Sequence, residues 1–172
     1  MNPLLKRFML KHRSYLKVHK QSYRAMTAGL KIVKLDESSI EQAAQLEKQV
    51  FKMPSSVDEL REFSSGDNLF AFAIYLDDKY VGHVTGYITK HGVNIYNLVV
   101  IPEYRGKGIG NKLMEYLETY TKEELENAIL LHVRESNVRA QKLYKSRGFE
   151  VYGKIPGFYG DEDAISMRKI VE

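Results

Sequence analysis

A glycine-rich turn at residues 105–110 carries the clearest chemical signal in this sequence. It follows an apolar, β-branched run that stops at Pro102 and leads directly into an amphipathic segment, so it joins a strand to the start of a helix. The first N–H groups of a helix lack partners within the helix, and the helix dipole places partial positive charge there. Glycines at positions 106, 108 and 110 keep Cβ atoms away from an anion, and Arg105 and Lys107 add full charges. These residues predict a site that binds a pyrophosphate group.

The spacing of the turn distinguishes between phosphate-binding motifs. The P-loop string is absent, and the glycines follow the pattern G-x-G-x-G instead of the dinucleotide pattern G-x-G-x-x-G. The string R-x-x-G-x-G from Arg105 to Gly110, placed after an apolar strand, resembles the acetyl-CoA motif of the GCN5-related N-acetyltransferase (GNAT) family. For this string alone, a glycine turn that only caps a helix is the alternative.

Further segments occur in the order typical of that family. A second apolar strand, 128–134, precedes Glu135-Ser136-Asn137, a helical run that contains Tyr144, and then Gly148-Phe149. The segment 157–167 is similar to the ending of the protein N-terminal acetyltransferases, such as the ribosomal-protein alanine acetyltransferase and the catalytic subunit of the co-translational N-terminal enzymes. The resemblance covers about residues 30–170.

The resemblance implies a GNAT fold of the α+β class, with a mixed, mostly antiparallel sheet of six to seven strands flanked by about four helices. The hydrophobic pattern of the sequence predicts the individual elements. Strands are expected at 30–35, 68–76, 80–89, 94–101, 128–134, 149–154 and 164–171. Helices are expected at 38–51, 57–63, 107–122 and 137–146, with Ser38 or Ser39 capping the first of them.

Acetyl-CoA is the cofactor that the resemblance implies, with CoA as the product and no metal ion. In the family, two neighbouring strands splay apart, and the pantetheine arm passes through the gap by pairing with free backbone groups. The residues expected to contact the cofactor are Leu98, Val99, Val100, Arg105, Gly106, Lys107, Gly108, Ile109, Gly110, Asn111, Asn137 and Tyr144.

Acetyl transfer to an amine needs a proton acceptor for the amine, a donor that polarises the thioester carbonyl and an acid for the leaving thiolate. Tyr144 stands at the family position of the acid, seven residues after Asn137, and a phenol with a pKa near 10 suits a thiolate leaving group. The backbone N–H of Val100 is the expected carbonyl donor. The alternative is that Tyr144 is one of twelve tyrosines and only packs on its helix.

His132 is the predicted proton acceptor, because it occupies the strand position at which the ribosomal alanine acetyltransferase carries a Glu. Some eukaryotic N-terminal acetyltransferases also carry Leu-His-Val on this strand, and a His with a pKa near 6.5 accepts a proton at neutral pH. The alternative is a His that is satisfied by hydrogen bonds under the peptide loop. Tyr96, Asn94 and Glu47 are other polar groups that could reach the amine.

The resemblance also implies which residues contact the acceptor substrate. They are Glu47, Phe51, Tyr96, Phe158 and Tyr159. Two departures from the family affect this region: the Pro-Glu-Asn-Tyr loop of the co-translational enzymes is missing, and the loop from Tyr159 to Glu162 is one residue shorter.

The composition limits the classes of protein and site. A chain of 172 residues favours one domain, and the absence of cysteine excludes disulfides, thiolate metal sites and a cysteine nucleophile. No apolar run approaches the length of a membrane span. We therefore expect a cytoplasmic protein with no membrane partner.

The positive charge is concentrated at the N-terminus. Residues 1–34 contain nine Lys or Arg and no acidic residue, so the formal net charge of +4 comes from this segment. The sequence therefore predicts a basic N-terminal extension, 1–29, and an acetyltransferase domain, 30–172. The basic residues could contact the ribosome or another polyanion, while a transit peptide and packing on the domain or on a neighbouring subunit are the alternatives.

The combined prediction is an acetyl-CoA-dependent N-acetyltransferase that modifies the α-amino group of a protein or peptide N-terminus by direct attack in a ternary complex. One alternative is an acetyltransferase for a small amine, such as a polyamine, an aminoglycoside or an amino acid. Another is a CoA-binding interaction module without turnover. No feature of the sequence specifies the preferred first residue or the oligomeric state.

Overall fold

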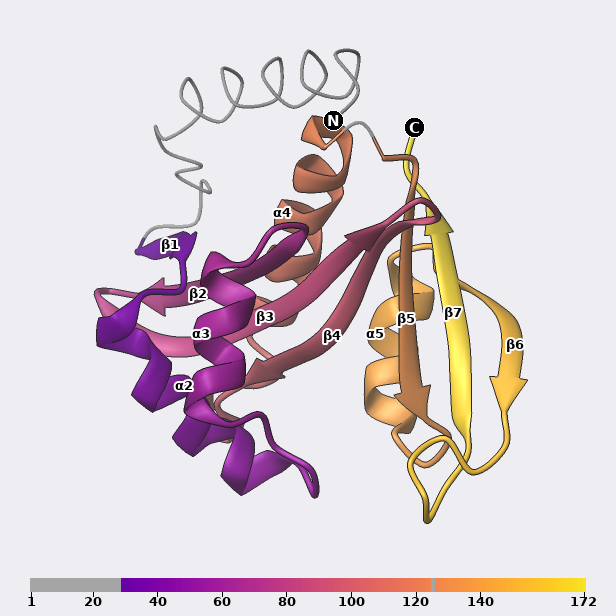
Figure 1. Cartoon of the computed structure of the whole chain (residues 1–172), viewed down its shortest axis with the longest axis horizontal. Helices are drawn as coiled ribbons and strands as arrows, with labels where there is room; N and C mark the ends of the chain where they lie inside the picture. The colour runs from indigo at the N-terminus through magenta and orange to yellow at the C-terminus, as the bar shows by residue number, and fades with distance from the viewer. Residues whose placement is uncertain (1–28, 125) are drawn as a thin grey trace, which may run out of the picture.

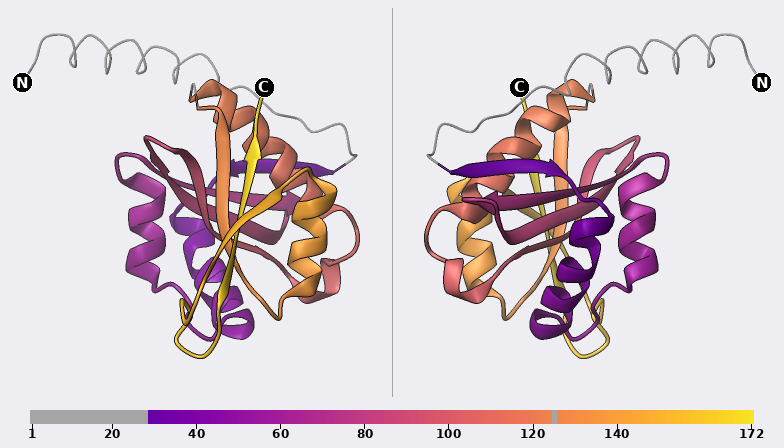
Figure 2. Two further views of the ribbon diagram at one scale, coloured as in Figure 1. Left: turned by 90° about the vertical axis from the view of Figure 1, so that its right-hand side faces the viewer. Right: turned by 90° about the vertical axis from the view of Figure 1, so that its left-hand side faces the viewer.

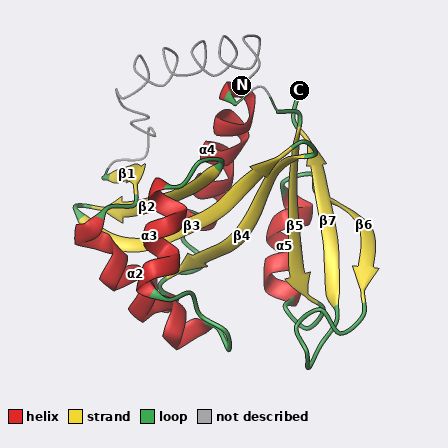
Figure 3. Cartoon of the chain, in the orientation of Figure 1, coloured by secondary structure: helices red, strands yellow, loops and turns green. Residues whose placement is uncertain are grey.

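A computed structural model describes residues 29–124 and 126–172. In this part of the chain, seven strands form one mixed sheet that carries helices on both faces, which confirms the predicted α+β class (Figures 1 and 3). The strands are β1 (Leu30–Lys34), β2 (Leu69–Leu76), β3 (Lys79–Thr89), β4 (Gly92–Val100), β5 (Ala128–Arg134), β6 (Glu150–Ile155) and β7 (Ala164–Ile170). The helices are α2 (Glu37–Val50), α3 (Val57–Ser65), α4 (Ile109–Glu123) and α5 (Val138–Ser146), with a short 3₁₀ helix, η1 (Pro102–Tyr104), before α4.

The sheet separates two pairs of helices. Helices α2 and α3 cover one face of its first half, and α4 and α5 lie on the opposite face (Figure 2). Strand β2 shows how the sequence builds both layers, because successive side chains of a strand point to opposite faces. Phe70 and Ile74 belong to the core under α4, whereas Ala71 and Ala73 belong to the core under α2 and α3.

The strand order is β1-β2-β3-β4-β5-β7-β6, and β4–β5 is its parallel contact. These two strands pair only where Val93–Ile95 lies opposite Ile129–Leu131, and they then diverge (Figure 1). Beyond this point β4 pairs only with β3, and β5 pairs only with β7. The divergence that the resemblance implied is therefore present, and beyond Ile95 and Leu131 the two strands no longer pair with each other.

A β-bulge lies at the point where β4 leaves β5. Gly86 of β3 pairs with Ile95, but the preceding Thr85 pairs with Asn97, so Tyr96 is the extra residue of β4. A bulge bends its strand and increases the local twist. It therefore helps to turn β4 away from β5 and to expose the side chain of Tyr96.

Three predicted helix starts were wrong by one or two residues, and that of α5 is Val138 because Asn137 is its N-cap. Asp36, and not Ser38 or Ser39, caps α2: its carboxylate accepts the Ser38 N–H at 3.1 Å, and the Ser39 hydroxyl completes the capping box. Helix α4 begins at Ile109 and not at Lys107, because Gly108 has φ +82° and cannot lie within a right-handed helix.

None of the described helices combines the length and the apolar character that a membrane span needs. The predicted extension, 1–29, lies outside the described residues except for Gly29. Its division from the domain and its contacts with a polyanion stay predictions.

Candidate active site

The turn at residues 105–110 has the backbone geometry of an anion site. Gly106 and Gly108 have φ values of +80° and +82°, which favour glycine, and a Cβ at Gly108 would meet no atom within 4 Å. Within the described part of the chain, the N–H groups of Gly106, Lys107 and Gly108 donate to no backbone carbonyl. The first backbone bond recorded at the start of α4 runs from Lys112 N–H to Gly108 O. Several N–H groups without a backbone acceptor thus lie at the positive end of a helix, beside a glycine with open space around it, as a pyrophosphate site requires.

The charged residues of the turn have structural partners of their own. Arg105 donates from Nε to the carbonyl oxygen of Val100 at 2.9 Å, which ties the turn to the end of β4. Lys107 Nζ lies 5.0 Å from the centre of the Tyr104 ring. Sequence reasoning missed Arg139, which lies in the first turn of α5. A Cβ added at Gly106 would lie 3.9 Å from Nη2 of Arg139. The signal in the sequence was its position two residues after Asn137, a predicted cofactor contact.

Other predicted cofactor contacts differ in what they can offer. Ile109 has its side chain in the core at 3% exposure, so only its backbone N–H is available. A Cβ at Gly110 would lie 3.3 Å from Leu143 Cδ2, so this glycine allows α4 to approach α5 closely. Asn137 is the N-cap of α5, where its Oδ1 accepts the Ala140 N–H at 3.1 Å. Asn111 lies in the first turn of α4 and is half-buried.

The free edge of β4 presents alternate residues to the gap. Ile101 N–H donates to Val81 O in β3, so the backbone groups of Ile101 and Val99 face β3. The backbone groups of Leu98 and Val100 then face the gap between β4 and β5. Val99, predicted as a cofactor contact, is a poorer candidate because its backbone is engaged and its side chain is buried in the core under α2.

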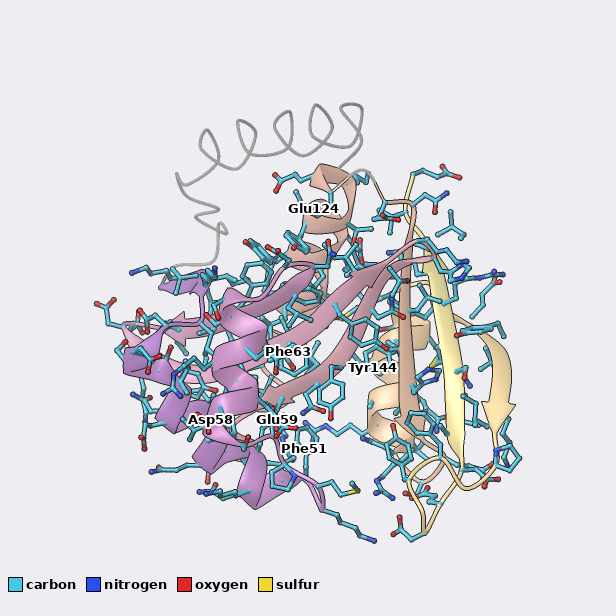
Figure 4. The ribbon with its side chains drawn as sticks, viewed as in Figure 1. Phe51, Asp58, Glu59, Phe63, Glu124 and Tyr144 are labelled. Atoms are coloured by element: carbon cyan, nitrogen blue, oxygen red, sulfur yellow. The ribbon has the colours of Figure 1, made fainter. Side chains whose placement is uncertain are left out.

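Tyr144 projects from α5 into the region where β4 and β5 diverge (Figure 4). It is 7% exposed, and its ring centre lies 5.7 Å from that of Phe149. Burial raises the pKa of Tyr144 above its ordinary value of 10. Its phenol therefore stays protonated at neutral pH and can act as a hydrogen-bond donor or an acid.

His132 lies on β5 one residue beyond the last pair with β4. Its Nδ1 is 2.9 Å from the Ser166 hydroxyl of β7, and its ring centre is 5.0 Å from that of Phe158. Burial lowers the pKa of His132 below 6.5, so the ring is neutral at pH 7. When Nδ1–H donates to Ser166, Nε2 carries the free lone pair that a proton acceptor needs. Sequence reasoning did not assign Ser166, although it lies within the terminal motif.

The predicted pair Phe158 and Tyr159 lies at the end of β5. Tyr159 donates its hydroxyl to the carbonyl oxygen of His132 at 3.1 Å, and its ring lies 4.3 Å from the Arg134 guanidinium. Phe158 is 49% exposed beside His132. The loop between β6 and β7 is thus fixed next to the predicted proton acceptor.

The β6–β7 loop and the α2–α3 connection meet beside the end of β5. Asp161 of the β6–β7 loop forms ion pairs with Arg134 at 2.8 Å and with Lys52 of the α2–α3 connection. Hydrogen bonds from Lys52 and Arg134 hold the pKa of Asp161 well below its ordinary value. Sequence reasoning missed this link, because the partners are 109 residues apart.

Two further predicted substrate contacts, Tyr96 and Phe51, lie on β4 and at the end of α2. Tyr96 is 53% exposed at the β4 bulge, and its ring centre is 5.1 Å from that of Phe63 on α3. Phe51 is the half-buried C-cap residue of α2. Figure 4 shows Phe51 and Phe63 on the side of α2 and α3 that faces Tyr144. Phe63 is a further aromatic residue that the sequence did not single out.

Glu47 does not occupy the place that the sequence predicted. Its side chain has 0% exposure, and its carboxylate accepts hydrogen bonds from neighbouring groups of the protein. Direct contact between this carboxylate and a substrate amine does not fit this geometry. Asn94 is likewise engaged, because its Nδ2 donates to the carbonyl oxygen of Gly92 at 2.9 Å.

A family model described as the acetyltransferase (GNAT) family matches residues 38–149. An uncharacterized N-acetyltransferase of Methanocaldococcus jannaschii is 33% identical over 141 residues, which cover 80% of this chain and 90% of the relative. N-alpha-acetyltransferase 20 of Dictyostelium discoideum is 34% identical over 116 residues, which cover 64% of this chain and 67% of that protein.

Solved structures share the fold. The crystal structure of the ribosomal-protein-S18-alanine N-acetyltransferase from Escherichia coli matches with a TM-score of 0.75 and 24% identity, and covers 83% of this chain and 94% of that chain. The crystal structure of an aminoglycoside 6'-N-acetyltransferase complexed with coenzyme A matches with a TM-score of 0.72 and 20% identity. It covers 83% of this chain and 97% of that chain.

Proposed function

The chain belongs to the acetyltransferase (GNAT) family, and from this premise we propose that it transfers an acetyl group from acetyl-CoA to the α-amino group of a protein N-terminus. The observation that carries the proposal is the gap between β4 and β5, which has Tyr144 beside it and His132 at its start. The relative from Dictyostelium discoideum, named N-alpha-acetyltransferase, supports an N-terminal substrate over a small amine.

The residues of this chain fit acetyl-CoA. The turn at Gly106 and Gly108 offers N–H groups without Cβ atoms, and the gap-facing backbone of Leu98 and the N–H of Val100 offer partners for an extended, amide-containing arm. Arg105, Lys107 and Arg139 place positive charge around the turn. Acetyl-CoA supplies the thioester from which the acetyl group is transferred.

Each remaining requirement of the reaction has a candidate group. The amine must lose a proton, and His132 Nε2 is placed to accept it directly or through water. The N–H of Val100 polarises the carbonyl on which negative charge develops. Burial keeps the Tyr144 hydroxyl protonated, so it donates to the sulfur on which negative charge develops as the carbon–sulfur bond breaks, and its proton passes to the departing thiolate. Direct attack by the amine requires no covalent enzyme intermediate.

The test is acetyl transfer by the full chain to a panel of short peptides that differ in the first residue, beside spermidine, lysine and an aminoglycoside. Each peptide has a matched copy with a blocked N-terminus and a free lysine side chain. We expect transfer to the free α-amine and none to the blocked copies, with the modified nitrogen located by mass spectrometry.

Two outcomes would overturn the proposal in different ways. A kcat/KM for a small amine that exceeds that of the best peptide would make the protein a small-molecule acetyltransferase. CoA binding without transfer to any amine in the panel would make it a non-catalytic CoA-binding module.

A further inference from the structure

A chain of hydrogen bonds lies buried between α2 and the sheet, and we call its residues the Glu47 network. Tyr80 OH lies 2.5 Å from His83 Nδ1, and His83 Nε2 lies 2.9 Å from Glu47 Oε1. Glu47 Oε2 accepts the backbone N–H of Ser55 at 2.7 Å and the side-chain N–H of Asn97 at 3.0 Å. Glu47 and His83 are completely enclosed, and Ser55 and Tyr80 are 4% and 5% exposed.

The direction of each bond follows from chemistry. An ionised carboxylate only accepts, so the hydrogen of the bond between His83 and Glu47 lies on His83 Nε2. When Nδ1 carries no hydrogen, it accepts the Tyr80 hydroxyl. Burial alone would raise the pKa of Glu47, but hydrogen bonds from His83 and the Ser55 N–H outweigh it and place the net pKa below its ordinary value. Glu47 is therefore an ionised carboxylate surrounded by donors.

The network connects the segments that border the substrate side of the gap. Ser55 belongs to the connection between α2 and α3, which also carries Lys52, the ion-pair partner of the β6–β7 loop. Asn97 follows the bulged Tyr96 in β4. Asn97 Nδ2 also lies 3.3 Å from the Ser55 hydroxyl, so the connection and the strand are linked twice. None of these residues belongs to the turn at 105–110.

We propose that Glu47 is a positioning residue of the acetyl transfer proposed above, which holds Tyr96 and the α2–α3 connection in the arrangement that orients the acceptor amine. It does so through Asn97 and Ser55, without touching the substrate. This inference rests on the proposed function. It replaces the predicted substrate contact of Glu47 with an indirect role that agrees with the burial of its carboxylate.

Three variants separate positioning from simple structural support. Glu47→Ala removes the acceptor of all three donors, and Asn97→Ala cuts only the link to β4. Glu47→Gln keeps an oxygen for the Ser55 and Asn97 donors, and its amide group faces His83, whose other tautomer accepts at Nε2. It serves as the conservative rescue because the links to the connection and to β4 are kept. The matched control is Glu118→Ala on α4, on the other face of the sheet. Glu118 Oε1 also binds two side chains, because it forms ion pairs with Arg147 Nη2 and Lys169 Nζ, each at 2.8 Å.

The measurements are kcat and KM for the best acceptor of the panel, CoA affinity by calorimetry, and thermal unfolding. We expect kcat/KM for the acceptor to fall on the order of 10²-fold in Asn97→Ala and Glu47→Ala, because a shift of about 1 Å in an orienting group has that effect. CoA affinity should stay within about threefold, since the cofactor turn is intact. Glu47→Gln should recover most of the loss, and Glu118→Ala should leave kcat/KM unchanged despite lower stability.

Asn97→Ala keeps the inference testable if Glu47→Ala does not fold. Unchanged kcat/KM in folded Asn97→Ala, or equal losses of acceptor kcat/KM and CoA affinity, would overturn the inference alone. A wild-type chain that acetylates no peptide would instead overturn the proposed function, and this outcome is visible before any variant is made.

Discussion

Replacing Tyr144 with Phe should remove the acid for the leaving thiolate and leave the fold intact. The ring is 7% exposed and packs against Phe149, and Phe fills the same space. No hydrogen bond within the described residues involves the Tyr144 hydroxyl, so its loss leaves no buried group unpaired. We therefore expect the free energy of unfolding to change by less than about 1 kcal/mol.

The effect on turnover should be much larger than the effect on stability. Burial raises the pKa of Tyr144, so the phenol is a donor throughout the pH range of an ordinary assay. A positioned acid typically contributes about 10²–10⁴-fold, and we expect kcat to fall at least about 10²-fold. Acetyl-CoA affinity should change by no more than about threefold, because only the departing sulfur loses its donor.

The assay follows the release of free CoA with a thiol-reactive dye, which the chain does not disturb because it contains no cysteine. Single-turnover measurements prevent slow product release from hiding the chemical step. Tyr152→Phe on β6, at a residue that is 47% exposed, is the control for loss of a phenol elsewhere. Equal single-turnover rates for Tyr144→Phe and the wild type would refute the reasoning and assign Tyr144 to packing.

Gly108→Glu should weaken CoA binding by on the order of tenfold or more in a titration, because it brings negative charge to the helix N-terminus. Gly148→Glu, at another positive-φ glycine, controls for strain, and equal affinities in both variants would contradict the pyrophosphate site. For His132, kcat/KM should fall as the pH drops through an apparent pKa below 6.5, because protonation removes the acceptor lone pair. His132→Gln should lose this limb and about 10²-fold in rate with the same peptide, and an unchanged limb would assign it to another group. Thr85→Val should raise the free energy of unfolding, measured by urea denaturation, by about 1 kcal/mol. The reason is that the Thr85 hydroxyl is buried without a hydrogen-bond partner among the described residues. A loss of stability would show that this hydroxyl is paired in solution.

The parts of the site that depend on neighbouring residues could be predicted from the sequence. The glycine spacing between Arg105 and Gly110 predicts the turn and, within two residues, the start of α4. Glycine conformations and free helix N–H groups are local properties, which is why the sequence is enough here. Tyr144 was singled out by the family resemblance, in which its position is counted from Asn137, the residue that caps its own helix.

Local signals were insufficient where several residues compete for one role. Asp36, Ser38 and Ser39 are all good N-caps, and the structure uses Asp36 as the cap and Ser39 as its partner in the capping box. The bulge at Tyr96 was also not predicted, because it is a mismatch between the registers of two strands.

The proton-transfer and substrate regions required contacts between distant parts of the chain. Ser166 reaches His132 across 34 positions, and Glu47 reaches Asn97 across 50. A sequence pattern marks an acidic residue on a helix as polar, but its exposure depends on which strand packs against it. That is why Glu47 was predicted to contact the substrate and is instead buried.

By itself, the sequence determined the family and the α+β class through motifs that occur in the family's order, and it located the glycine turn, because glycine spacing acts over a few residues. Only the tertiary structure decided where β4 leaves β5, which backbone edges face the gap and which polar groups are enclosed. These features arise from pairing and packing between segments far apart in the chain, and no local pattern encodes them. The gap between β4 and β5 is therefore a property of the assembled sheet, whereas the glycine turn is a property of six consecutive residues.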